Sequence, residues 1–156
     1  MNKILSLFAV LSVLVLSSCT SNESQVKKLA LADAETQFNE LIQKEADEYI
    51  TQSEFLKNAY VSYMKKNSEF EIDEVTIQNE NLAVAAVKVT TYPPVQRKLM
   101  VKIAGTVNPS RERQFNFGNA IQLIREQTGQ TVTSEKIPAG VFKYHKNSKG
   151  DWLLEK

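Results

Sequence analysis

The sequence predicts an α+β fold, in which N-terminal helices pack on a curved antiparallel sheet and a further helix precedes the last strands. Three observations predict it. Residues 26–66 contain no Gly or Pro and repeat apolar residues at spacings of three and four, which is typical of amphipathic helices. From residue 70 the apolar period changes to two, which is typical of strands. Elements of one kind follow one another in runs, which argues against a parallel sheet.

The first predicted helix covers residues 23–50. Its apolar positions are Leu31, Ala34, Phe38, Leu41, Ile42 and Tyr49. Thr51 and Glu54 match a capping box, in which Thr51 is the N-cap and Glu54 reaches back to it. We therefore expect a second helix over residues 52–66. Tyr49 of the first helix and Tyr60 and Tyr63 of the second lie at helical spacing. We expect them to pack in the core or a groove; the alternative is a ligand cage.

Two strands are expected next, over residues 70–77 and 82–92. The second is apolar on both faces at its start, which fits a central position in the sheet. Pro93 and Pro94 end it, because proline cannot donate to a strand ladder. Residues 97–107 alternate again through Leu99, Val101 and Ile103, which predicts a third strand, and a turn follows at residues 108–110.

A third helix is predicted between Asn116 as its N-cap and Gly129 just past its end. Residues 131–138 are polar and are expected to form a loop or an edge strand. The last two strands are expected at residues 141–145 and 152–154. Trp152 should pack on the concave face of the sheet and close one end of the core.

The first nineteen residues have the layout of an export signal. Lys3 is followed by an apolar run over residues 4–16, then Ser17, Ser18 and the only cysteine of the chain, Cys19. The apolar run has the length of a signal-peptide core and is shorter than the roughly 20 residues that a membrane-spanning helix needs. The sequence therefore predicts an exported protein.

The junction Leu16-Ser17-Ser18-Cys19 resembles the lipobox of bacterial lipoproteins. The resemblance implies a diacylglyceryl group on the thiol of Cys19, cleavage before Cys19, and a further acyl chain such as palmitate on the new N-terminus. Because Thr20 rather than Asp follows Cys19, it also implies the outer membrane, facing the periplasm, in cells with two membranes. In other cells it implies the exterior face of the cell membrane. The alternative is an ordinary secretory signal.

The expected organisation is a signal peptide at residues 1–18, a lipidated tether at residues 19–25 and one domain at residues 26–156. Removing the signal removes Lys3 and no acidic residue, which leaves 18 basic and 18 acidic residues. A neutral chain lacks the basic footprint of a nucleic-acid-binding protein. Since Cys19 is the only cysteine, no internal disulfide is expected.

The last predicted strand and the two residues before it read Gly150-Asp151-Trp152-Leu153-Leu154. With two N-terminal helices and an antiparallel sheet, this motif resembles small exported lipoproteins of the cystatin-like or nuclear-transport-factor-two-like type. The resemblance implies a cone-like sheet with a pocket. The helix that begins after Asn116 falls later in the chain than the third helix of that family.

Few residues suggest chemistry. His145 is the only histidine, so a site with two histidine ligands is excluded, and no G-x-S-x-G turn presents a serine nucleophile. We expect His145 at the rim of a hairpin. The acidic residues 69–74 lack the glycine and oxygen spacing of a calcium loop and suggest a solvated strand entry. We predict no catalytic, cofactor-binding or metal-binding residue.

A local basic patch is one possible interaction surface. Arg97, Lys98, Arg111 and Arg113 would meet at one end of the strand predicted over residues 97–107. Such a patch would suit anionic head groups or a protein partner. The alternative is an ordinary charged loop.

Together these features predict a membrane-anchored lipoprotein whose domain is not an enzyme but a binding or protein-interaction module of the cell envelope. Its partners would be the membrane, through the lipid on Cys19, and an envelope protein or a small apolar ligand. Two alternatives remain. One is a small enzyme with a buried acid beside His145 or a tyrosine, and the other is an assembly factor that uses the long first helix as its partner surface.

Overall fold

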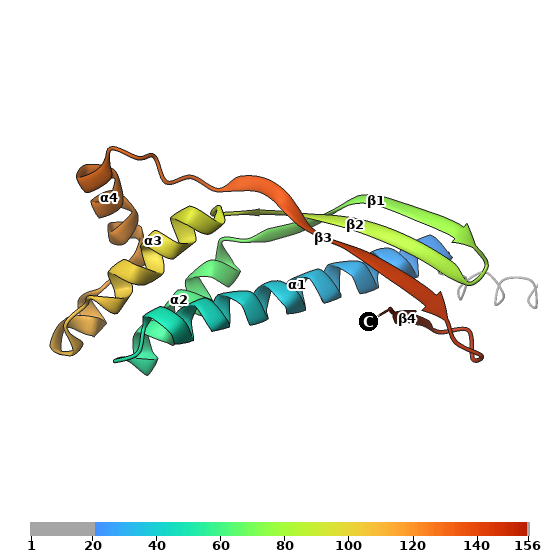
Figure 1. Cartoon of the computed structure of the whole chain (residues 1–156), viewed down its shortest axis with the longest axis horizontal. Coiled ribbons are helices and arrows are strands. Elements are labelled where there is room, and N and C mark those ends of the chain that lie inside the picture. The colour runs from blue at the N-terminus through green and yellow to red at the C-terminus, as the bar shows by residue number, and fades with distance from the viewer. Residues whose placement is uncertain (1–20, 156) are drawn as a thin grey trace, which may run out of the picture.

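The computed structural model describes residues 21–155, and it confirms the α+β class. Helix α1 packs on a four-stranded antiparallel sheet of order β1-β2-β3-β4, and helices α3 and α4 lie between β2 and β3 in the chain (Figure 1). The elements are α1 (Asn22–Tyr49), α2 (Glu54–Lys66), β1 (Glu69–Asn79), β2 (Leu82–Thr91), α3 (Pro94–Gly105), the 3-10 helix η1 (Pro109–Gln114), α4 (Phe117–Thr128), β3 (Glu135–Lys146) and β4 (Trp152–Leu154). The predicted signal peptide and Cys19 lie outside the described residues.

Helix α1 runs along most of the length of the molecule (Figure 1). Its 28 residues span about 42 Å at 1.5 Å per residue. Every fourth residue is buried: Val26, Ala30, Ala34, Phe38, Ile42 and Ala46. Ser21 caps its start, because its hydroxyl accepts a bond from the Ser24 N–H at 3.2 Å. The helix therefore begins inside residues 19–25, the segment expected to be a tether.

The first half of α1 covers the inner face of the sheet. Alternate residues of β2 point toward it, and this strand lies between β1 and β3, which confirms its predicted central position. The core here joins Val26, Ala30 and Ala34 with Ala83, Ala85, Val87, Phe142, Tyr144 and Trp152. Trp152 is buried at the last strand, as expected.

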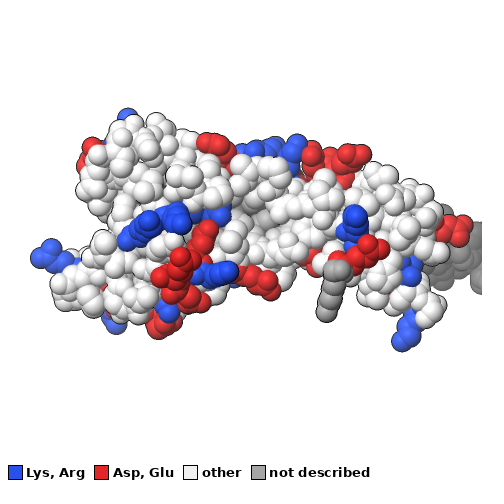
Figure 2. Space-filling view, viewed as in Figure 1, with Lys and Arg blue, Asp and Glu red and all other residues white. Residues whose placement is uncertain are grey.

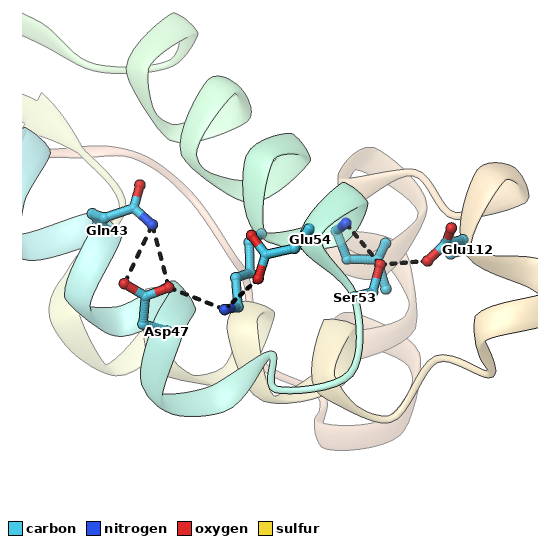
Figure 3. Close-up of polar contacts among 7 residues, drawn as sticks. Gln43, Asp47, Ser53, Glu54 and Glu112 are labelled. Atoms are coloured by element: carbon cyan, nitrogen blue, oxygen red, sulfur yellow. Dashed lines mark hydrogen bonds and ion pairs between the residues drawn. The ribbon is translucent and has the colours of Figure 1, made fainter.

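The second half of α1 packs against α2 and α3, and α4 joins the same second core of larger side chains. This core includes Ile42, Ile50, Leu56, Tyr60, Met64, Met100, Phe117 and Ile124. Figure 3 shows how α2 starts here. Ser53, not Thr51, is its N-cap: the Ser53 hydroxyl accepts from the Leu56 N–H at 3.1 Å and bonds to Glu112 of η1. The capping-box prediction was therefore wrong by two residues, because Ser53 has the extended backbone that an N-cap needs.

Residues 97–107 do not form the predicted strand. They belong mostly to α3, whose buried residues Arg97, Met100, Val101 and Ala104 recur at helical spacing. Pro94 occupies the first turn, where its fixed φ favours a helix, so the Pro93-Pro94 pair both ends β2 and starts α3. Gly105 lets the end of α3 approach α1 closely, since a Cβ there would clash with the carbonyl oxygen of Tyr49.

In the last third of the chain, the structure agrees better with the elements predicted from the sequence. Asn116 caps α4 through a bond from the Gly118 N–H at 2.7 Å, and Gly129 follows it with a φ of 67°. Within residues 131–138, β3 begins at Glu135. This strand pairs with β2 along its length, whereas β4 pairs only with its last three residues. The first part of β3 therefore lies at an edge of the described sheet.

Candidate functional site

Two adjoining hollows follow one flank of α1, where α3 and the start of β3 approach it. The first has a volume of about 260 Å³ and the second about 340 Å³, and both are lined by Leu41 and Pro94. We call this continuous surface the α1 groove. Its main lining residues are Phe38, Leu41, Val89, Pro94, Ile137 and Ala139 in the first hollow, and Lys44, Glu45, Glu48, Tyr49 and Lys98 in the second.

The end of the groove nearest the sheet is apolar. Phe38 forms its base, where it meets Phe70 edge-on with ring centroids 5.6 Å apart. Leu41 remains 44% exposed at its wall. Figure 2 shows an uncharged, hollowed surface between the sheet half of the molecule and the charged side chains that gather over α1 and α3. This end can receive an apolar side chain of a ligand or partner.

The opposite end of the groove is polar, and Lys44 and Lys98 line it together with Glu45 and Glu48. Lys98 and Lys102 of α3 each place their ammonium nitrogen 5.6 Å from the centre of the Tyr49 ring. The pKa of Lys98 is raised, first by its bond to the Tyr49 hydroxyl and also by the charges of Glu48 and Glu45. Lys98 therefore stays positively charged at the rim.

An ion pair lies beneath the groove. Arg97 is only 3% exposed, and its guanidinium bonds to both carboxylate oxygens of Glu45 at 3.0–3.3 Å and to the Tyr92 carbonyl oxygen at 2.9 Å. The Tyr60 hydroxyl donates to the same carboxylate at 2.7 Å. The network joins α1, α2 and α3, and the opposite charges of Arg97 and Glu45 balance within it.

The predicted basic patch is not formed. Arg97 is buried against Glu45 instead of lying on the surface, and Lys98 is on the rim of the α1 groove. Arg111 and Arg113 are in η1, which packs beside α2. The patch was inferred from a strand end, and the segment is a helix, so its residues point in different directions.

A carboxylate bonded to a tyrosine, which the enzyme alternative requires, occurs twice within residues 21–155. Glu45 faces Tyr60 under the groove, and Asp33 accepts a bond from the Tyr144 hydroxyl at 2.6 Å in the sheet half. Burial is the main cause that raises the pKa of both tyrosines, and the neighbouring carboxylate raises each pKa further. Both phenols therefore stay protonated and act as hydrogen-bond donors.

His145 and the acidic strand lie apart from these pairs. His145 is opposite Leu82 and Leu153 in the sheet register, next to the inward-facing Tyr144. Glu71 pairs with Lys136 at 2.7 Å and Asp73 with Lys88 at 2.6 Å, as solvated residues of a strand do. Within residues 21–155, no three His, Cys, Asp or Glu side chains gather as a metal site requires.

Comparisons with protein-family models, curated proteins and solved structures find no match to this chain. Among the helices that the structure describes, none has the length and apolar character to cross a bilayer.

Proposed function

We propose that this chain is a membrane-anchored lipoprotein of the cell envelope, and that its folded body is a non-catalytic domain that binds a partner protein in the α1 groove. The lipobox-like sequence at Cys19 supports the anchor. The α1 groove is the observation that carries the binding role, because it places a mainly apolar hollow directly beside a charged rim in which Glu45 is already paired with Arg97.

The charges of the groove favour an acidic partner segment. Arg97 and Glu45 neutralise each other below the surface, which leaves Lys44, Lys98 and Lys102 around Glu48. A segment with one apolar side chain and a nearby carboxylate would fill the hollow and meet this positive charge. The partner we propose is therefore an acidic stretch of another envelope protein.

The enzyme alternative has less support. Both oxygens of Glu45 accept bonds from Arg97, and Tyr60 donates to the same carboxylate, so groups of the protein itself already occupy this acid. The assembly alternative through the apolar stripe of α1 also has less support, because that stripe is buried in the two cores.

The anchor is tested by Cys19→Ser in cells that express the full chain. We expect loss of fatty-acid labelling and accumulation of the uncleaved precursor, because the thiol is the proposed site of lipid attachment. Normal processing and membrane retention of this variant would contradict the anchor.

The groove is tested by placing a photo-crosslinking amino acid at Leu41 in intact cells, with Leu123 of α4 as the matched control. The two leucines are 44% and 42% exposed on helices. We expect one discrete adduct from position 41 and none from position 123. The adduct should disappear in Lys98→Glu/Lys102→Glu and persist in the control Lys28→Glu/Arg125→Glu. Equal adducts from both positions, or no effect of the groove charges, would overturn the binding role.

A further inference from the structure

The two ends of the molecule differ in their distance from the proposed lipid. At one end, which we call the hairpin end, the start of α1 lies beside the β1–β2 and β3–β4 turns (Figure 1). Lys146 holds these parts together. Its ammonium donates to the Asn22 side chain at 2.9 Å, and its backbone N–H donates to the Asn81 carbonyl at 3.0 Å.

Very little chain separates this end from Cys19. Only Thr20 and Ser21 lie between Cys19 and the first residue of α1. Three residue steps reach at most about 11 Å even when fully extended. A lipid on Cys19 therefore keeps the hairpin end within about one helix diameter of the lipid head groups.

The composition of the surfaces favours an upright body over one that lies flat. The long sides carry charges of both signs. On the outer face of the sheet, Glu69, Glu71 and Glu74 of β1 are joined by Lys88, Lys136 and Lys143 of the neighbouring strands, and Glu71 pairs with Lys136. Such a balanced face gives anionic head groups no net attraction that would hold the body flat. The turns of the hairpin end expose uncharged Asn79, Asn81 and Ser148, with Glu80 and Lys149 as opposite charges. This end, which the short tether keeps near the bilayer, can contact head groups without net repulsion.

We infer that the hairpin end rests on the membrane surface and that α1 points away from it, so that the α1 groove is displayed to proteins at a distance from the bilayer. This inference rests on the proposed lipid anchor. Leu41 lies nineteen residues after Asn22, or about 28 Å along α1. The partner would therefore be met well outside the head-group layer.

The experiment uses the full-length, lipidated protein in vesicles of phosphatidylethanolamine and phosphatidylglycerol. Because the chain has no cysteine besides Cys19, one introduced cysteine can be labelled with a fluorophore once Cys19 carries lipid. Ser148→Cys reports on the β3–β4 turn. Ser110→Cys reports on η1 at the opposite end of the molecule, which we call the helical end. Both serines are exposed. A quencher attached to the lipid head groups is then added.

We expect strong quenching at position 148 and little at position 110. Ten Gly and Ser residues inserted between Thr20 and Ser21 should weaken quenching at position 148, because the longer tether frees the body. Equal quenching at both positions, or stronger quenching at position 110, would overturn the upright orientation while leaving the anchor intact. Failure of the protein to sediment with the vesicles would overturn the anchor and the orientation together.

Discussion

The sheet end and the helical end of this molecule are built on one helix but are packed by different side chains. Against the sheet, α1 contributes Ala30 and Ala34, which face Ala83 and Ala85 of β2 within one cluster. From Phe38 onward, α1 contributes Phe38, Ile42 and Ala46 to a core in which three other helices supply mostly large side chains. Small side chains let the helix lie close to the sheet, whereas large ones hold the helices apart. The α1 groove lies where these two kinds of packing meet.

The largest expected effect breaks the sheet end. Trp152→Ala should lower the free energy of unfolding by about 3–5 kcal/mol, because it removes a buried aromatic ring. Urea denaturation measures this loss, with Trp152→Phe as the milder control. Hydrogen exchange should show faster opening of the first half of α1 than of α2. Equal acceleration of both would mean that the two cores unfold as one.

The next effect breaks the ion pair beneath the groove. Arg97→Met should cost about 2–3 kcal/mol, at or below the usual range for a broken buried pair, because Glu45 remains 18% exposed and is partly hydrated. Combining it with Glu45→Gln should cost less than the sum of the single changes, since no unpaired charge then remains. Additive losses in this double-mutant cycle would show that the two residues are not coupled.

Each end has one buried tyrosine that donates to a carboxylate of α1, so the two can be compared directly. Tyr60→Phe and Tyr144→Phe should each cost about 1.5–3 kcal/mol, the usual contribution of a hydrogen bond to a charged group. Denaturation of the two variants under the same conditions measures both. If one of the two variants shows no loss, the tyrosine hydroxyl removed in that variant is well solvated in the folded protein.

The same tyrosines predict sensitivity to alkali. Their pKa values are raised in the folded state, so the unfolded chain loses these protons first, near the usual tyrosine pKa of about 10. Their contribution to stability is therefore complete below about pH 10 and falls as the pH rises further. The Tyr60→Phe/Tyr144→Phe variant should show a flatter profile of stability between pH 9 and pH 11, and an unchanged slope would contradict this origin.

The smallest effect concerns helix caps at the helical end. Ser53→Ala and Asn116→Ala should each cost about 1 kcal/mol, because each removes a side-chain acceptor from a helix start. Ser53 also bonds to Glu112, so its loss should be the larger of the two (Figure 3). Thermal unfolding measures both losses. A larger loss from Asn116→Ala would show that the Glu112 contact adds no stability.

Local periodicity predicted most of the fold. The spacing of α1, the alternation of β2 and the glycine after α4 are all local signals, and the structure has these elements close to their expected bounds. It failed at α3, because Leu99, Val101 and Ile103 alternate by chance on a helix that starts at a proline. Within five residues, alternation alone does not separate a strand from a helix.

The candidate site was harder to predict, because its parts are distant in the sequence. Arg97 meets Glu45 across 52 residues, and no local pattern indicates such a pair. One signal was available for the groove. The buried residues of α1 recur every four positions from Val26 to Ala46, and Leu41 falls outside that series. A single exposed leucine is an ordinary feature of a surface helix, so this signal alone did not identify the groove.

The proposed lipid on Cys19 sets both the location of the protein and the direction in which the α1 groove faces. Mass spectrometry of the N-terminal peptide of the native protein, purified from membranes, measures it. We predict a peptide that begins at Cys19 and carries a diacylglyceryl group on its sulfur. A free thiol at Cys19, or a mature chain that begins at another residue, would contradict the account.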